Sequence, residues 1–362
     1  MKDTANSTTI TNTSIKKIVF TGGGTAGHVM PNLAIIPLLK NFELHYVGCP
    51  DSVEERLIKK HAPFVKFHAI EASKLQRGKI LKNLSLPFKL LRSKKAAKRL
   101  LKELQPDLIF SKGGFVALPL CLATKNIPII LHESDFSFGL ANRLALKKCN
   151  TICTSFSDLA YNTNNAVHTG SPLRQEIYKG DKAIVEKITN LKGNKNLLII
   201  GGSLGAAAIN NAVFDSLDYL TQHFSVIHIT GKNCDKKITR NNYYQTEFVE
   251  NISDYFAWSD YCITRGGANA LFELIALNIP SLVIPLPKGA SRGDQVLNAN
   301  YFKNLGCVEV LTQDEMQNNK NSLNLALDNL QKKTPSLKTV MKSQVNIDGT
   351  YKIVAIIKDN ML

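Results

Sequence analysis

The sequence lacks any uncharged apolar run that approaches the length of a bilayer crossing, and it is poor in acidic residues. A spanning helix needs about 20 consecutive apolar residues, so a transmembrane protein is not expected. The 362 residues include 45 Lys and Arg against 29 Asp and Glu, which gives a formal net charge of +16. This excess indicates an anionic partner, namely a nucleic acid, an anionic membrane or a phosphorylated ligand.

Patterns that bind metals or form disulfides are also missing. The seven cysteines are scattered, odd in number and without a C-x-x-C pair, which favours free thiols in a cytosolic protein. Neither H-E-x-x-H nor D-x-D occurs, so we expect no metal and no other cofactor. Residues 1–14 lack the basic start and apolar core of a signal peptide, and we interpret them as a disordered leader before a cytoplasmic domain.

The chain is organised as two halves of similar pattern. Its length predicts two domains at about 150 residues each, and 44% apolar and 20% charged residues are ordinary for globular proteins. A β-branched run at 16–21 ends in a glycine-rich stretch at 22–27, before an apolar segment compatible with a helix, and this order recurs from 196 onward. Strand, glycine loop and helix in succession are typical of a doubly wound α/β unit.

A sequence pattern that occurs once in each half supports this division. Ser111-Lys112-Gly113-Gly114 precedes Asn126-Ile127-Pro128, and Thr264-Arg265-Gly266-Gly267 precedes Asn278-Ile279-Pro280 at nearly the same distance. We therefore predict an α/β fold of two Rossmann-like domains that face a cleft, at 15–172 and 173–345, with a changeover in the turn-rich segment 169–174. A helix at about 346–362 is expected to pack back on the first half.

Four glycine turns, at 22–27, 113–114, 201–205 and 266–267, follow the expected strands. Glycine lets backbone N–H groups approach a phosphate, and a helix N-terminus adds partial positive charge, so the turns favour anionic ligands in the cleft. The first turn matches G-x-G-x-x-G, yet the acid that binds ribose in dinucleotide sites arrives late, at Asp51, which disfavours NAD. His28 and Val29 stand where a Walker A loop has Lys and Ser or Thr.

Two histidine segments near these turns have both a structural and a functional interpretation. His28 follows the first loop and is either a helix-cap residue or a catalytic base or substrate contact. His132-Glu133-Ser134-Asp135 is expected just beyond a strand, either as a solvated loop or as part of an active site at the edge of the sheet.

Four further residues lie where a nucleotide would bind. Glu273 is either a solvated helix carboxylate or the acceptor for a ribose diol. Arg174 and Arg265 are either surface arginines or neutralise phosphates, and Ser203 either caps its helix or donates to a phosphate. Without a metal motif, protein dipoles and cations are expected to hold a leaving phosphate.

The stretch 77–102 carries ten Lys and Arg side chains interleaved with apolar ones. A basic amphipathic surface is attracted to an anionic bilayer, which makes membrane binding one interpretation. A solvated helix face over a core is the second. Nucleic-acid binding ranks lowest, because no nucleic-acid module is recognisable, and we expect no nucleic-acid partner.

Eight segments together carry a resemblance to a known family: TGGGTAGH at 21–28, GGF at 113–115, HESD at 132–135, GLAN at 139–142, GSPLR at 170–174, GGSLG at 201–205, RGGA at 265–268 and DQVLNA at 294–299. From residue 16 to about 358 the sequence resembles the MurG family, the UDP-N-acetylglucosamine:lipid I N-acetylglucosaminyltransferases of bacterial peptidoglycan synthesis. The resemblance implies a B-type glycosyltransferase at the cytoplasmic face of the membrane, bound as a peripheral protein. The reaction implied is metal-independent transfer, with inversion, of GlcNAc from UDP-GlcNAc to the C4 hydroxyl of MurNAc in lipid I.

The resemblance also implies roles for individual residues. The donor would contact Thr25, Ala26, Gly27, Asp135, Arg174, Ser203, Val249, Arg265, Ala268, Glu273 and Gln295, with Glu273 on the ribose, Val249 near uracil and Gln295 on the sugar. The acceptor pyrophosphate would lie at Gly23, Gly24, Gly113 and Gly114. His28 is the first candidate for the catalytic base, followed by His132 and Asp135.

Five residues depart from the family pattern: Ala26 replaces Gly, Phe115 a common Tyr, Asp135 a frequent Asn, Gly266 a Ser and Asp294 a Gln. Two other functions stay open at this point. A UDP-GlcNAc 2-epimerase shares the two-domain architecture but would need no lipid acceptor. A basic, non-catalytic module that binds nucleotide or nucleic acid is the second alternative, and a steep salt dependence of its nucleic-acid affinity would support it.

Overall fold

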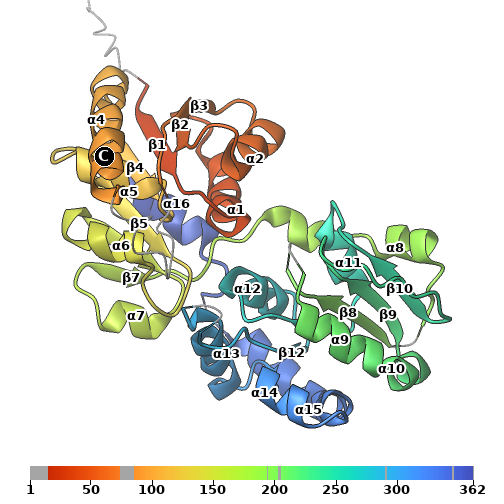
Figure 1. Cartoon of the computed structure of the whole chain (residues 1–362). Coiled ribbons are helices and arrows are strands. Elements are labelled where there is room, and N and C mark those ends of the chain that lie inside the picture. Colours follow the sequence, from red (N-terminus) through yellow and green to blue (C-terminus); the bar gives the residue numbers. More distant parts are fainter. Residues whose placement is uncertain are drawn as a thin grey trace, which may run out of the picture.

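The computed structural model describes residues 15–73, 85–193, 195–202, 205–289, 292–344 and 346–361. These residues form two α/β domains, each built on a parallel sheet, which lie beside one another (Figure 1). The arrangement confirms the expected fold class. The expected leader at 1–14 and residues 77–84 of the basic stretch lie outside the described residues.

The first domain has a seven-stranded parallel sheet in the order β3-β2-β1-β4-β5-β6-β7. Its strands are β1 (Lys17–Thr21), β2 (Glu43–Gly48), β3 (Lys66–Ala69), β4 (Leu108–Ser111), β5 (Ile129–Glu133), β6 (Thr151–Thr154) and β7 (Ala166–His168). Its helices are α1 (Ala26–Ile35), α2 (Val53–His61), α4 (Leu86–Leu104), α5 (Ala117–Ala123), α6 (Leu140–Ala145) and α7 (Ser157–Tyr161), with 3-10 turns η1 (Ile36–Leu39) and η2 (Leu146–Lys148).

The second domain has a six-stranded parallel sheet in the order β10-β9-β8-β11-β12-β13. Its strands are β8 (Asn196–Ile200), β9 (Ser225–Ile229), β10 (Tyr243–Thr246), β11 (Tyr261–Thr264), β12 (Ser281–Val283) and β13 (Glu309–Val310). Its helices are α8 (Lys182–Thr189), α9 (Ala207–Asp215), α10 (Leu217–His223), α11 (Ile252–Trp258), α12 (Ala268–Ala276), α13 (Asp294–Asn304), α14 (Gln313–Asn318) and α15 (Ser322–Ser343), with the 3-10 turn η3 (Gln175–Lys179).

The apolar strands explain why each sheet is covered on both faces. Side chains alternate along a strand, so a continuous apolar run needs a core on each side. In β1, Ile18 and Phe20 pack with α1 and α16 (Thr350–Asp359), whereas Val19 packs on the opposite face with Ala97 and Leu101 of α4. The last helix, α16, thus lies in the core of the first domain although it ends the described chain (Figure 1).

Two segments cross between the domains side by side. Ser171 N–H donates to Ile347 O (3.1 Å), and Gly349 N–H donates to Ser171 O (2.8 Å). Gly170 permits this approach: its φ is +85°, and a Cβ there would lie 1.9 Å from Asn346 O. The expected changeover at 169–174 therefore coincides with a double crossing, which sets how the domains face each other.

We predict that Gly170→Ala destabilises the protein more than a substitution that strains the backbone alone. Gly306 is the matched control, because its φ is +74° but the nearest atom to an added Cβ is 3.8 Å away. Gly306→Ala is expected to lower the free energy of unfolding by about 1 kcal/mol, and Gly170→Ala by about 3 kcal/mol, because a clash adds to the strain. Urea denaturation measures both. Equal losses would show that the crossing tolerates a wider separation.

Candidate active site in the cleft between the domains

The first glycine loop and the loop after β4 lie against each other. Gly24 has a φ of +84°, and a Cβ there would lie 2.4 Å from the Phe115 ring. A Cβ at Gly114 would lie 2.5 Å from Gly23 O. The four glycines expected to hold the acceptor pyrophosphate are thus brought together at the carboxyl edge of the first sheet.

Sequence reasoning missed Glu54, a buried carboxylate behind the first loop. It is 1% exposed, and its oxygens accept N–H groups of Gly24 (3.1 Å) and Cys49 (3.1 Å). Gly113 N–H donates within the protein as well, to Ser111 Oγ (3.3 Å). Glu54 lies on α2 after β2, near where the dinucleotide fingerprint has its ribose-binding acid, and here the carboxylate stabilises the loop instead.

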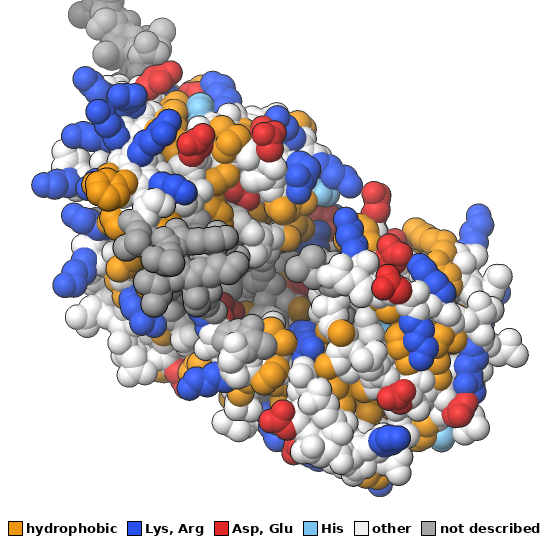
Figure 2. All heavy atoms as spheres, viewed as in Figure 1, with side chains coloured by type: hydrophobic (Ala, Val, Ile, Leu, Met, Phe, Trp, Pro, Cys, Tyr) orange, Lys and Arg blue, Asp and Glu red, His pale blue; other side chains and the backbone are white. Residues whose placement is uncertain are grey.

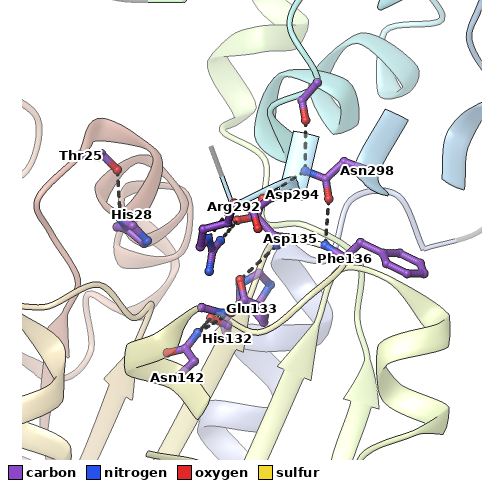
Figure 3. A network of polar contacts seen from close by, with 12 residues as sticks. Thr25, His28, His132, Glu133, Asp135, Phe136, Asn142, Arg292, Asp294 and Asn298 are labelled. Atoms are coloured by element: carbon purple, nitrogen blue, oxygen red, sulfur yellow. Dashed lines mark hydrogen bonds and ion pairs between the residues drawn. The ribbon is translucent and has the colours of Figure 1, made fainter. Parts of the chain in front are cut away.

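His28 lies in the first turn of α1, close to the cleft. Its Nδ1 is 3.0 Å from the hydroxyl of Thr25, the residue that precedes the helix (Figure 3). Ala26 begins the helix and is exposed, so its methyl group has room where the family pattern has glycine. The described geometry therefore places Thr25, Ala26, Gly27 and His28 together at the cleft.

His132 is not on a solvated loop, because β5 continues through His132 and Glu133. His132 is fully buried, with Nε2 3.4 Å from both Gly170 O and Ser155 Oγ. Burial, assisted by Lys112, holds its pKa well below the usual 6.5. Burial disfavours protonation of the ring, and this weighs against His132 as the catalytic base.

Glu133 organises the loop that follows β5. Its carboxylate accepts from the N–H groups of Asp135 (3.1 Å) and Gly139 (2.9 Å) and from Asn142 Nδ2 (2.9 Å). Burial raises the pKa of Glu133 and lowers that of Lys112, which lies buried beside it. The loop is thus held by polar contacts between Glu133 and residues a few positions further along the chain.

Asp135 contacts the second domain directly. Its Oδ2 accepts from Arg292 Nη2 (2.9 Å), and its Oδ1 accepts from Asn298 Nδ2 (3.1 Å) (Figure 3). Sequence reasoning singled out neither Arg292 nor Asn298. Both carboxylate oxygens of Asp135 are therefore engaged by the second domain, and this residue joins the two domains.

The donor candidates of the second domain lie at the carboxyl edge of its sheet. Glu273, on α12, is partly exposed, with Arg174 Nη2 3.8 Å from its Oε1. Burial raises the pKa of Glu273, and Arg174 opposes that rise. Gln295 Oε1 accepts Leu286 N–H (2.9 Å), and Val249 lies beyond β10. Gln295 therefore lies beside the loop that precedes α12, and Arg174 lies beside Glu273 on that helix.

Other expected donor residues have different surroundings. Arg265 Nη1 donates to Ile284 O (3.1 Å) and Gln313 Oε1 (3.2 Å), so this nitrogen supports the domain rather than extending into the cleft. Ala268 is buried as the first residue of α12, which leaves its backbone as the part that can meet a ligand. Ser203 lies outside the described residues, next to Gly202, whose φ is +97°.

The amino ends of the two domains' helices also touch. Asn269, on α12, donates from Nδ2 to Gly27 O on α1 (3.0 Å).

A Cβ at Gly266 would lie 2.4 Å from Gln295 O, so the loop before α12 packs closely on α13. This contact explains the departure at Gly266, because the serine of the family pattern would not fit at this separation.

Comparison with known proteins identifies the family. Residues 18–154 match the glycosyltransferase family 28 N-terminal domain, and residues 196–356 match the C-terminal domain of that family. A protein of Lachnospira eligens named UDP-N-acetylglucosamine--N-acetylmuramyl-(pentapeptide) pyrophosphoryl-undecaprenol N-acetylglucosamine transferase is 44% identical over 96% of this chain and 99% of its own. The chain belongs to the MurG family. A protein of the same name from Clostridium botulinum (strain Alaska E43) is 46% identical over 83% of this chain and 87% of its own.

A solved structure agrees with the MurG fold. The crystal structure of Acinetobacter baumannii MurG aligns with a TM-score of 0.74 at 23% identity, over 95% of this chain and 99% of that one. Within the part of this MurG-family chain that the structure describes, no helix has the length and apolarity to cross a membrane. The same residues contain no group of three or more His, Cys, Asp or Glu side chains that could hold a metal ion.

We predict that acid destabilises this MurG-family protein through buried neutral histidines. Burial lowers the pKa of His132 and lowers that of His228, on β9, to about 4. The unfolded chain protonates these rings near pH 6.5, so the unfolded state binds more protons and stability falls as the pH drops from about 6.5 toward 4. His228 alone is expected to contribute about 2 kcal/mol of this loss between pH 7 and 5.

Urea denaturation across this pH range measures the effect. His228→Gln should flatten the pH dependence, because it removes one titrating ring, whereas the control His223→Gln on the surface should leave the slope unchanged. An unchanged slope in His228→Gln would contradict the account.

Proposed function

We propose that this chain transfers N-acetylglucosamine from UDP-GlcNAc to the C4 hydroxyl of MurNAc in lipid I, the undecaprenyl-pyrophosphoryl-MurNAc-pentapeptide, with inversion and without a metal cofactor. The product is lipid II. The observation that carries the proposal is 44–46% identity, over most of the chain, to relatives named for this transfer. The names favour a transferase over the epimerase and over a binding module.

The second domain would bind the donor. Backbone N–H groups at the N-terminus of α12 attract a diphosphate, and Gly267 leaves space there, since no atom lies within 4 Å of an added Cβ. The Glu273 carboxylate would accept hydrogen bonds from the two ribose hydroxyls, and Arg174 favours its charged form. Gln295 already accepts Leu286 N–H through Oε1, so its amide nitrogen is the group that would donate to a sugar hydroxyl.

The first domain would bind the acceptor and supply the base. The loops at Gly23–Gly24 and Gly113–Gly114 are in contact. The N–H groups of Gly24 and Gly113 already donate to Glu54 and Ser111, so the N–H groups of Gly23 and Gly114 would hold the lipid pyrophosphate. His28 is the proposed base: it would take the proton of the MurNAc hydroxyl as that oxygen attacks C1, and UDP would leave on the opposite face of the sugar. The Thr25 hydroxyl beside Nδ1 would orient the ring.

The α4 surface would meet the membrane. Phe88 and Leu91 on α4 are 75% and 62% exposed, and Lys94, Lys95 and Lys98 are exposed on the same helix. Figure 2 shows Lys and Arg side chains gathered on the side of the first domain where α4 lies. Apolar side chains among cations suit the surface of an anionic bilayer, where lipid I would be presented on the cytoplasmic side.

The first experiment measures UDP release from UDP-GlcNAc, with and without a lipid I analogue, in the presence of EDTA. We expect release that requires the acceptor and withstands EDTA. Release or sugar isomerisation without an acceptor would contradict the proposal and indicate hydrolase or epimerase chemistry. Loss of turnover with EDTA that returns on adding a divalent cation would contradict metal independence alone.

We predict that His28→Ala lowers kcat about 100-fold or more, the usual contribution of a general base, with little change in the KM for UDP-GlcNAc. Steady-state kinetics and the pH profile of kcat measure this effect. His223→Ala, a surface histidine on α10, is the control and should retain wild-type turnover. Near-normal turnover in His28→Ala would remove His28 from the role of base.

Reversing the charge of α4 tests the proposed membrane surface. Lys94, Lys95 and Lys98 changed together to Glu should weaken binding to vesicles that contain phosphatidylglycerol by about 100-fold or more, since each basic residue contributes about 1 kcal/mol. Lys182, Lys187 and Lys192 changed to Glu are the matched control on the second domain. UDP affinity should be unchanged in both variants. Equal vesicle binding by the two variants would refute a membrane role for α4.

A further inference from the structure

Two of the family departures meet at one arginine. Arg292 donates from Nη2 to Asp135 Oδ2 (2.9 Å) and from Nε to Asp294 Oδ2 (2.7 Å) (Figure 3). Asp135 follows β5 in the first domain, whereas Asp294 begins α13 in the second. The two carboxylates, one from each domain, thus share a single guanidinium across the domain boundary.

A buried amide fixes the same boundary. Asn298 is fully buried, and its Oδ1 accepts Phe136 N–H (2.8 Å) from the first domain. Its Nδ2 donates both to Asp135 Oδ1 (3.1 Å) and to Gly266 O (3.1 Å). A relative movement of the domains would separate Asn298 from its first-domain partners, and a buried polar group without partners is unfavourable.

This cluster adjoins the donor residues. Gln295 follows Asp294 on α13, and a Cβ at Gly266 would lie 2.4 Å from Gln295 O. A Cβ at Gly139, in the first domain, would lie 3.1 Å from Arg292 Nη1. The guanidinium therefore rests on the loop that Glu133 organises while its Nε holds the first turn of α13.

We propose that Arg292 is a positioning residue for the transfer. By pairing with Asp135 and Asp294 together, it sets the separation at which the base on α1 faces the sugar held by Gln295, without touching either substrate. Without the guanidinium, the carboxylates of Asp135 and Asp294 would lose the cation that they share, and their mutual repulsion would favour a more open cleft. The inference rests on the proposed transferase function.

A double-mutant cycle tests this role. Arg292→Gln is expected to lower kcat/KM about 10-fold or more, because small displacements of reacting groups strongly slow a reaction. Asp135→Asn alone should lower kcat/KM about threefold, in the range of a partly exposed ion pair. The double variant should be at least as active as Arg292→Gln, because removing the second charge relieves the repulsion. If the loss of kcat/KM in the double variant equals the product of the losses in the two single variants, the proposal is overturned.

Three further measurements separate positioning from general damage. An interdomain fluorophore pair should report a longer distance in Arg292→Gln with donor bound, and a shorter one in the double variant. UDP binding to the second domain should change less than threefold, so the loss appears mainly in kcat. Arg292→Lys should recover only part of the activity, because one ammonium cannot reproduce the fork that serves both carboxylates.

Arg240→Gln is the matched control, since Arg240 pairs with Asp218 inside the second domain, and it should retain wild-type kinetics and distance. If the wild-type protein shows no acceptor-dependent UDP release, the proposed function fails, and the distance measurement alone decides whether Arg292 holds the domains. An unchanged distance in folded Arg292→Gln and Arg292→Lys would refute the positioning role.

Discussion

The crossing of two backbone segments at Gly170 is the constraint on which the cleft depends. Gly170 lets the outgoing chain lie directly against residues 346–349 as the chain returns to the first domain. The returning segment ends in α16, which packs in the core of the first domain. The domains are therefore joined by two short connections, and the carboxyl edges of both parallel sheets, where ligands of such folds bind, face each other.

Contacts across the cleft then bring together residues that are distant in sequence. Asn269 donates to Gly27 O, and Asn298 and Arg292 both contact Asp135. These links join donor candidates on α12 and α13 to the base candidate on α1 and to the loop after β5. The carboxylates of Asp135 and Asp294 share the guanidinium of Arg292, so charge is balanced within this cluster at the domain boundary.

The glycine turns and apolar runs sufficed to predict two α/β domains, because a parallel strand buried on both faces needs a continuous apolar run. The local sequence pattern gave the wrong prediction where a side chain is buried against groups that are distant in sequence. The apolar run ends at Leu131, so His132 and Glu133 resembled a loop, yet β5 continues through both residues. His132 lies beside Gly170 O, which is distant in sequence, and Glu133 accepts from the loop that follows it. Arg292 carried no local signal, and the motif at 294–299 did not reveal the role of Asn298, since both roles depend on a domain distant in sequence.

The most direct test of the account is a crystal structure with UDP-GlcNAc bound. We expect that structure to show the diphosphate at the N-terminus of α12 and the ribose hydroxyls on Glu273. Uracil should lie near the backbone of Val249, and the sugar beside Gln295. A nucleotide bound instead to the first-domain loop at 22–27, with Glu273 still paired only to Arg174, would contradict the assignment of donor and acceptor to the two halves.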